Sequence, residues 1–470
     1  MTNNTDLAFT PALEQARLIR DRSISPLELV KLYLDRIEQY DAQLGSYFSV
    51  AAETALAQAQ AKTEELANSS DTAVLPPFFG VPTAIKDLNS VVGMPLTYGV
   101  AALQGNIGSY DDGVVTRIKS SGFVILGKTA TSEVGSFPYI ETPGLPPTRN
   151  PWNLDYTAGG SSGGAAAAIA AGLCPVAPGS DAGGSIRGPA TCCGLVGIKP
   201  ARGRISYAPV GDFLNGIATN GTLGRTVADA AALLDVMSGY VTGDPYWLPA
   251  PEISFLEATN REPKQLRIAF STALPPFGEA ATICQQGIQA TVKLLEEMKH
   301  LVEPACPQVE DLVEPFTKIW QAGVAAFGIP LELLSPLNRW NGERVGSAGE
   351  YLQAVSQMQI IARRMVAFFE QYDVLILPVY LHQPIRVGEW ADLSPPATLD
   401  KIIHWIAPCP PFNVTGLPAI AIPTGFDTNG LPAGIQIIGK PAAETTIIAL
   451  AAQLEKANPW QSYRPTMFNF

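Results

Sequence analysis

Residues 159–187 decide the fold, and they read GGSSGGAAAAIAAGLCPVAPGSDAGGSIR. Two glycine-serine clusters, around Ser161 and around Ser185, are joined by an alanine-rich run of helix length. Glycines beside a serine let the backbone take positive φ and approach a ligand closely, and consecutive amides there can form a nest for an oxyanion. A single Gly-Ser pair is more often a tight turn with a capping serine. Two such clusters flanking one predicted helix favour a functional site.

Short apolar runs alternate with helical patterns on both sides of this stretch. The predicted buried strands are residues 81–85, 123–126, 175–178, 266–270, 374–379, 419–425 and 433–439. The predicted helices are residues 51–67, 114–120, 226–238, 286–299, 354–371 and 444–457, and a capping box at Ser25 and Glu28 begins an earlier one. Asp111 and Asp112 are candidate caps of the helix at 114–120. This alternation predicts an α/β fold with a large mixed β-sheet sandwiched between helices.

The same patterns divide the chain into four segments. Residues 1–66 are predicted to be an N-terminal helical segment, and residues 67–248 the first part of a catalytic core. Residues 249–407 are richer in Pro, Trp and charge than their flanks, which indicates a variable layer facing the substrate. Residues 408–470 are predicted to complete the core.

The composition excludes several classes of protein. The chain has 470 residues, a formal net charge of -12, 47% hydrophobic and 16% charged residues, which is typical of a globular protein. The acidic balance argues against a nucleic-acid partner and against an anionic membrane, because both need clustered Lys and Arg. No window is long enough for a membrane span, and residues 1–9 lack the features of a signal peptide. We expect a cytoplasmic protein with a small-molecule partner, and we leave a homodimer open.

The cysteines indicate neither disulfides nor metal. All six lack a CxxC or Cys/His ligand spacing, which predicts free and mostly buried thiols and no structural metal.

Ser185 is a candidate nucleophile, and a nucleophilic serine needs a group that accepts its proton. The three histidines, His300, His382 and His404, occupy a helix end, a loop and an apolar stretch, where structural or surface roles are expected. Lys86 is the better base, because it follows the apolar run 81–85 and so lies at the end of a buried strand. To act near neutrality its pKa must fall by about three units, which corresponds to roughly 4 kcal/mol of desolvation.

Residues 122–129 match a phosphate-binding Walker pattern, which makes a phosphate or nucleotide binder one alternative. A phosphate loop needs a flexible turn between its glycines. Here residues 123–126 are apolar and suit a buried strand, so the pattern argues against nucleotide binding.

The sequence resembles the amidase signature family over most of its length. The motifs that carry the resemblance are GVPTAIKD at 80–87, GKT at 127–129, GGSSGG at 159–164, GSDAGGSIR at 179–187, GLVGIKP at 194–200 and FNVTGLP at 412–418. The resemblance implies an amide hydrolase that needs no cofactor and no metal. It also implies a catalytic triad, in which Ser185 is the acylated nucleophile, Lys86 is the base and Ser161 relays the proton from a cis peptide.

Further roles are implied by the same resemblance. The backbone amides of Ala182, Gly183, Gly184 and Ser185 would form the oxyanion hole, in which one donor is typically worth about 3 to 4 kcal/mol. A supporting pair, Asp181 and Arg187, would fix this loop. The chain departs from the family pattern at Ala130, where asparagine is common, and at Ala182, where threonine is frequent.

Two questions about function stay open at this point. Within the family, the chain could instead be the glutaminase subunit of a tRNA-dependent amidotransferase, but residues 210–220 lack the Ser-Leu-Asp-Gln stretch in which such subunits resemble one another. Five aromatic residues in the variable segment either pack in the core or line a pocket for apolar or aryl amides, including oligomeric or cyclic ones. They are Trp320, Phe327, Trp340, Trp390 and Trp405.

Overall fold

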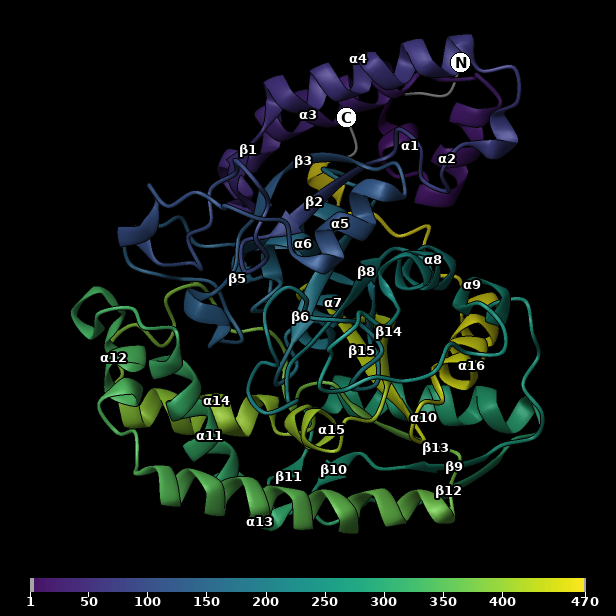
Figure 1. Cartoon of the computed structure of the whole chain (residues 1–470). Helices are drawn as coiled ribbons and strands as arrows, with labels where there is room; N and C mark the ends of the chain where they lie inside the picture. The colour runs from purple at the N-terminus through teal and green to yellow at the C-terminus, as the bar shows by residue number, and fades with distance from the viewer. Residues whose placement is uncertain (1–3, 469–470) are drawn as a thin grey trace.

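An eight-stranded mixed sheet forms the centre of the molecule in the computed structural model, which describes residues 4–468 (Figure 1). Its strand order is β12-β9-β13-β15-β14-β7-β8-β6. Strand β9 pairs in parallel with β12 and β13, and the other neighbours pair antiparallel. The strands are β6 (Val176–Asp181), β7 (Val196–Lys199), β8 (Thr219–Gly224), β9 (Arg267–Phe270), β12 (Leu301–Pro304), β13 (Val374–Pro378), β14 (Ala419–Phe426) and β15 (Pro432–Gly439).

A smaller three-stranded sheet lies beside the β6 edge of the central sheet. Its order is β1-β3-β2, with strands β1 (Tyr47–Val50), β2 (Pro82–Lys86) and β3 (Val124–Thr129). The hydroxyl of Thr83 in β2 donates a hydrogen bond of 2.8 Å to the Val176 carbonyl in β6. This contact brings the carboxyl-terminal ends of β2 and β6 close together. The remaining strands form two short hairpins, β4 (Arg149–Asn150) with β5 (Asn153–Thr157), and β10 (Ala273–Leu274) with β11 (Gly278–Glu279).

Helices cover both faces of the central sheet. A side chain at Gly434 of β15 would meet Thr191 of α7, whereas one at Gly439 of the same strand would meet Ile447 of α16. Successive strand residues point to opposite faces, so α7 and α16 lie on opposite faces. Helix α6 packs with α7, and α8 and α10 pack with α16. These helices are α6 (Gly163–Ala170), α7 (Arg187–Cys193), α8 (Val227–Met237), α10 (Thr282–Glu297) and α16 (Glu444–Ala457).

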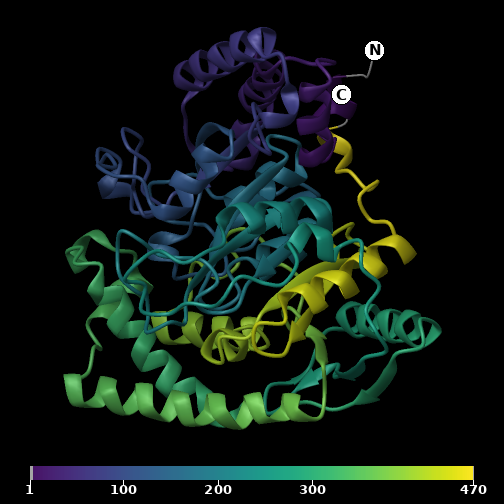
Figure 2. The same cartoon turned by 45° about the vertical axis from the view of Figure 1, so that its right-hand side comes forward.

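Two further groups of helices lie at opposite ends of the molecule, and Figures 1 and 2 show both. The N-terminal group is α1 (Asn4–Ala8), α2 (Ala12–Arg20), α3 (Pro26–Leu44) and α4 (Ala52–Asn68). The second group, drawn in green, is α11 (Val313–Ala326), α12 (Pro336–Gly342), α13 (Ala348–Ala367) and α14 (Pro395–Ile406). The short helices α5 (Gly113–Ser120), α9 (Phe255–Ala258) and α15 (Pro410–Val414) complete the set.

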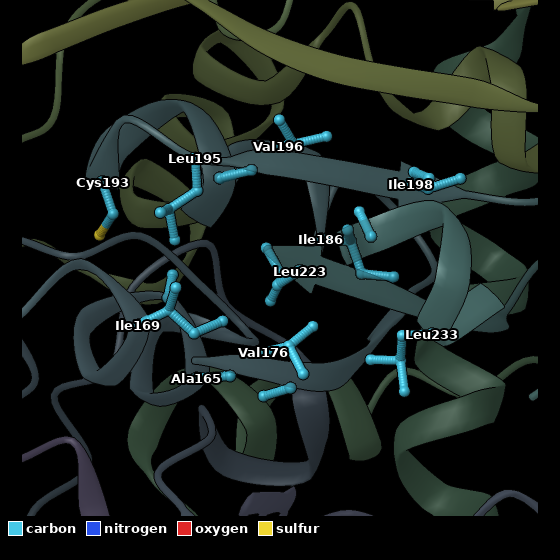
Figure 3. Close-up of a cluster of buried hydrophobic side chains, with 14 of the residues drawn as sticks. Ala165, Ile169, Val176, Ile186, Cys193, Leu195, Val196, Ile198, Leu223 and Leu233 are labelled. Atoms are coloured by element: carbon cyan, nitrogen blue, oxygen red, sulfur yellow. The ribbon is translucent and has the colours of Figure 1, made fainter. Parts of the chain in front are cut away.

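The core behind the glycine-serine clusters is apolar and closely packed. Figure 3 shows Ile169 of α6, Val176 of β6, Val196 of β7, Leu223 of β8 and Leu233 of α8 in one cluster. Each of these side chains is fully buried. Burial on this scale makes the strand ends and helix starts above the cluster a rigid support for the serine clusters.

The predicted fold class is confirmed, with an α/β sheet sandwiched between helices. All seven predicted strands form, but residues 81–85 and 123–126 contribute to the smaller sheet. The prediction omitted three strands of the central sheet, namely the edge strand β12 and the strands β7 and β8 between β14 and β6. Strand β8 reads TNGTLG, so it shows neither an apolar run nor alternation, and its burial comes entirely from its neighbours.

Other expectations have mixed outcomes. The capping box at Ser25 and Glu28 is present at the start of α3. Asp112 stands at the N-cap position of α5, but its side chain makes no capping bond there. The cysteines are free, and all but the half-buried Cys306 are buried. The division into four segments stays a prediction, although residues 249–407 supply β9, β12 and β13 to the sheet.

No helix among residues 4–468 is long and apolar enough to cross a membrane. The first three residues of the segment 1–9 lie outside the described residues.

Candidate active site

Four chain segments bring the candidate site residues together. Lys86 is the last residue of β2, and Asp181 is the last residue of β6. Ser161 stands just before α6 and Ser185 just before α7. The contact between β2 and β6 therefore places a lysine beside both serine clusters.

The Lys86 amine is buried among hydroxyl groups. Its Nζ lies 2.7 Å from Ser161 Oγ, 2.9 Å from Ser162 Oγ and 2.9 Å from Ser180 Oγ. No carboxylate of residues 4–468 forms an ion pair with it. Burial lowers the pKa of Lys86 to about 7, against a smaller raising effect of the Asp181 charge. A sizeable fraction of the amine is therefore neutral at physiological pH, as general-base chemistry requires.

The two serines of the predicted triad are connected to the lysine to different extents. The Gly160–Ser161 peptide bond is cis, and the Ser161 hydroxyl contacts the Lys86 amine. Within the described part of the chain, the Ser185 hydroxyl makes no hydrogen bond, including none to Ser161. Both serines border the same cavity, and the Ser162 amide donates to the Ser185 carbonyl at 3.1 Å. The lysine-to-Ser161 contact is formed, and the contact from Ser161 to Ser185 is not.

A buried ion pair holds the segment before α7. Arg187 contacts both carboxylate oxygens of Asp181, with Nε–Oδ2 and Nη2–Oδ1 distances of 3.0 Å each. Asn413 of α15 donates to Asp181 Oδ1 at 2.9 Å, and Arg187 donates to Gln436 of β15 at 2.8 Å. Burial alone would raise the pKa of Asp181, but the Arg187 guanidinium holds it well below its ordinary value. The Asp181 carboxylate is thus ionised and cannot serve as a base for Ser185.

The same carboxylate also accepts a hydrogen bond from one amide of the predicted oxyanion hole. The amide of Gly184 donates to Asp181 Oδ1 at 2.7 Å, so this N–H group is already used. Among the described residues, the amides of Ala182, Gly183 and Ser185 have no hydrogen-bond partner. The N–H group of Gly184 closes a turn onto the ion pair, and its place in the oxyanion hole stays a prediction.

Two cavities meet at Ser185. The larger has a volume of about 380 Å³ and is lined by Ser161, Ser185 and polar and aromatic side chains. The smaller has a volume of about 60 Å³ and is lined mainly by apolar side chains of α11 and α14, including Phe316 and Ile402. Trp320 of α11 borders both. A nucleophile at such a junction can reach a carbonyl whose two substituents extend into different compartments.

The aromatic residues of the variable segment divide between the two expected roles. Trp320 and Phe327 line the larger cavity. Trp405 is fully buried, donates from Nε1 to the His382 carbonyl at 2.8 Å, and lies edge-on to Trp390. Trp340, Trp390 and Trp405 line neither cavity.

The three histidines also line neither cavity. The Leu266 amide donates a hydrogen bond of 3.1 Å to Nδ1 of His300, and the His382 ring stacks on Trp405. His404 is exposed on α14. A lysine base is therefore the arrangement that this geometry supports.

The apparent Walker pattern is a buried strand. Lys128 lies in β3, is fully buried, and forms an ion pair of 2.8 Å with Asp87. A lysine committed to a buried carboxylate cannot hold a phosphate, so the nucleotide-binding alternative fails.

Four residues at the site had no predicted role. Ser162 and Ser180 contact the Lys86 amine, and Asn413 and Gln436 contact the ion pair. The first three lie inside the motifs already noted. Gln436 gave no signal, because a lone glutamine in an apolar strand reads as any buried polar residue.

No group of three or more His, Cys, Asp and Glu side chains within residues 4–468 is arranged to hold a metal ion. The residues that converge at this site are hydroxyls, one amine and backbone amides, which are the groups used in acyl transfer.

Comparison with known proteins agrees with this chemistry. A family model described as Amidase matches residues 28–448. The chain belongs to the amidase family. This amidase is therefore a hydrolase that acts on the carbon-nitrogen bond of amides.

Individual relatives extend over nearly the whole amidase. A putative amidase of Synechocystis sp. (strain ATCC 27184 / PCC 6803 / Kazusa) is 57% identical over 452 residues, which cover 96% of this chain and 89% of that protein. The 6-aminohexanoate-cyclic-dimer hydrolase of Paenarthrobacter ureafaciens is 33% identical and is covered to 97%, as is this chain. A solved structure of 6-aminohexanoate cyclic dimer hydrolase complexed with substrate superposes with a TM-score of 0.91 at 30% identity, covering 98% of this chain and 99% of that one.

Proposed function

We propose that this amidase cleaves a carboxylic acid amide through an acyl-enzyme on Ser185, with Lys86 as the base and Ser161 as the proton relay. The observation that carries the proposal is the buried Lys86 amine, which touches hydroxyls and no carboxylate and has a pKa of about 7. A neutral amine hydrogen-bonded to Ser161 can accept a proton from it, as acylation of a serine requires.

Acylation begins when Ser185 Oγ attacks the carbonyl carbon of the substrate. Its proton passes to Ser161 Oγ while the Ser161 hydroxyl proton passes to Lys86 Nζ. The free amides of Ala182, Gly183 and Ser185 are suited to receive the resulting oxyanion. This transfer needs a contact between Ser161 and Ser185 that is absent without substrate, and such contacts often tighten only when substrate binds.

The tetrahedral adduct then collapses. The carbon-nitrogen bond breaks, the leaving nitrogen takes a proton back from the Lys86 ammonium through Ser161, and an ester remains on Ser185. A water molecule attacks this ester after losing its proton along the same route. The acid leaves, and Ser185 regains its hydrogen. Asp181 and Arg187 support the steps by fixing the loop that carries the amides and Ser185.

Substitution of the three groups tests the proposal. In Ser185→Ala, kcat for an aryl amide should fall by at least about 10³-fold without a change in thermal stability, and Lys86→Met should lose activity to a similar extent. Ser394→Ala, at the exposed N-cap position of α14 where the hydroxyl makes no capping bond, serves as the matched control and should keep full activity. Turnover by Ser185→Ala would refute the acyl-enzyme route.

Mass spectrometry gives a second test. Quenching the enzyme during turnover of an activated amide should yield protein heavier by one acyl group, and peptide mapping should place that group on Ser185. An acyl group on any other residue would contradict the assignment.

The two cavities support a substrate class. Apolar or aryl groups suit the smaller cavity and the aromatic part of the larger one, and an oligomeric or cyclic amide suits a site with two compartments. The glutaminase alternative requires a site for the α-carboxylate of glutamine. No Lys, Arg or His lines the larger cavity within the described residues, so we favour a free hydrolase. Its cytoplasmic location and a homodimeric state stay predictions.

A further inference from the structure

The charged side chains that line the larger cavity are all acidic. Three carboxylates line it, those of Asp112, Asp181 and Asp212, and no cationic side chain of residues 4–468 does. Asp181 is neutralised by its two contacts with Arg187. No ion pair among the described residues involves Asp112 or Asp212. The cavity therefore presents carboxylates that no cation contacts to whatever enters it, and burial raises the pKa of both.

Asp112 is the more enclosed of these two carboxylates. Its Oδ2 accepts hydrogen bonds of 3.0 Å from the Asn89 side chain and from the Ser90 amide. Its Oδ1 has no partner within the described residues. The nearest buried cation, Lys128, directs its amine to Asp87 and to the Pro95 carbonyl instead. Asp112 thus keeps one acceptor oxygen that the protein itself does not use.

A second unused acceptor lies next to it. Asn89 lines the same cavity and is 95% buried, being 5% exposed. Its Nδ2 donates to Asp112, while its Oδ1 is buried with no partner among residues 4–468. A buried acceptor left unpaired destabilises a protein by about 1 to 3 kcal/mol, so a ligand group that brings a donor within reach of Oδ1 would be stabilised there.

Aromatic side chains complete this part of the cavity. Tyr98, Tyr110 and Tyr207 line it together with Trp320 and Phe327. The rings of Tyr98 and Phe327 pack edge to face with centroids 5.6 Å apart. Aromatic faces attract cations through the ring quadrupole, and carboxylates bind ammonium groups by charge-assisted hydrogen bonds. Both features disfavour an anionic substrate.

We propose that the larger cavity binds the part of the amide substrate that carries a protonated primary amine, with Asp112 and Asn89 as its acceptors. The inference rests on the proposed function, and it specifies that function further by naming a substrate class. Asp112 then determines specificity, and the rest of the substrate extends past Ser185 into the smaller apolar compartment.

Matched substrates test the inference. One series varies the acyl end as para-nitroanilides of δ-aminovaleric, hexanoic and adipic acids, which place ammonium, methyl or carboxylate on chains of equal length. A second series varies the amine end, with N-butyrylputrescine against N-pentylbutyramide. In the series whose variable end enters the larger cavity, kcat/KM should favour ammonium over methyl by about tenfold or more, and carboxylate should be the poorest.

Variants link this preference to Asp112. Asp112→Asn keeps an acceptor for Asn89 and should reduce the ammonium-to-methyl ratio of kcat/KM by about tenfold or more. Asp392→Asn, which changes an exposed carboxylate on the surface, should leave the ratio unchanged. Equal kcat/KM values for ammonium and methyl substrates in both series would overturn the inference, as would an unaltered ratio in Asp112→Asn.

The inference and the proposed function can fail separately. Hydrolysis of the hexanoyl anilide with a preference for methyl would overturn only the ammonium site. Absence of hydrolysis in every series would count against the proposed function. In that case, calorimetry on the Ser185→Ala protein decides the inference, because N-butyrylputrescine should bind more tightly than N-pentylbutyramide and lose that advantage when Asp112→Asn is added. Equal binding of the two amides would overturn it.

Discussion

At the scale of single residues, Lys86 and Lys128 show how neighbours decide the chemistry of one side-chain type. Both amines are fully buried. Lys128 lies beside Asp87, so its charge has a counter-charge, whereas Lys86 has only hydroxyls around it. Without a counter-charge, burial favours the neutral amine, and a neutral amine can act as a base.

The pH dependence of activity follows from this. Burial lowers the pKa of Lys86 to about 7, so the base is protonated below that pH and free above it. For a neutral amide, log kcat/KM should rise with unit slope below about pH 7 and level off above it, when measured between about pH 5 and pH 9.

A second buried lysine could give the same pH profile, because burial also lowers the pKa of Lys199 to about 7. The experiment therefore needs a variant of Lys199 as a control. Its amine donates only to the Pro200 carbonyl, and it lines neither cavity. Lys199→Met should keep the pH profile of the parent. A flat profile in the parent enzyme would rule out Lys86 as the base.

At the scale of elements, helix α3 shows how local residues fix where an element begins and ends. Helix α3 packs Leu29, Val30 and Tyr33 into the core, and all three side chains are fully buried. Its start is fixed by the reciprocal bonds between Ser25 and Glu28. Its end is fixed at Gly45, where a positive φ lets the chain turn toward β1.

Removal of this cap should destabilise the fold without touching the chemistry. Ser25→Ala loses the bond to the Glu28 amide and should reduce the free energy of unfolding by about 1 kcal/mol. Ser25→Asp retains an acceptor at the N-cap and should behave like the parent. Denaturant titration measures both, and a loss of kcat/KM in Ser25→Ala at low temperature would contradict a purely structural role.

At the scale of the whole molecule, the site is closed by a segment far away in the sequence. Glu133 precedes the glycine-serine clusters and is 1% exposed. Its carboxylate accepts the Ser335 amide at 2.9 Å and the Asn338 side chain at 2.7 Å, both at the start of α12. These bonds join the α11–α14 layer to the catalytic half, and α11 supplies Trp320 to both cavities.

Weakening this connection should affect substrate binding more than chemistry. Glu133→Gln removes the charge from these hydrogen bonds and replaces one of the two oxygens that the Ser335 amide contacts by a donor, which should reduce stability by about 1 to 3 kcal/mol and raise KM more than it lowers kcat. Glu332→Gln, at an exposed position nearby, is the matched control. Unchanged KM in a destabilised Glu133→Gln would show that the layer does not shape the site.

The sequence was most informative where local patterns carry the information. The capping box of α3, the strand before Lys86 and the two glycine-serine clusters could each be predicted from neighbouring residues. Strand β8 could not be, because its residues gain their burial from β6, β7 and the helix α8, which meet it only in the folded molecule. The hydrogen bond from the Gly184 amide to Asp181 could not be predicted either, because the direction of an N–H group depends on contacts that no pattern along the chain reveals.

The chain alone determined the fold class and the side chains that could do chemistry, because both follow from residue types and short spacings. Tertiary structure decided which of the buried amines is free, which backbone amides are unused, and which acids line the cavity without a counter-ion. Those properties depend on distances between segments that meet only after folding. Burial and electrostatic interactions depend on distances in space, whereas the sequence gives only the order of residues along the chain.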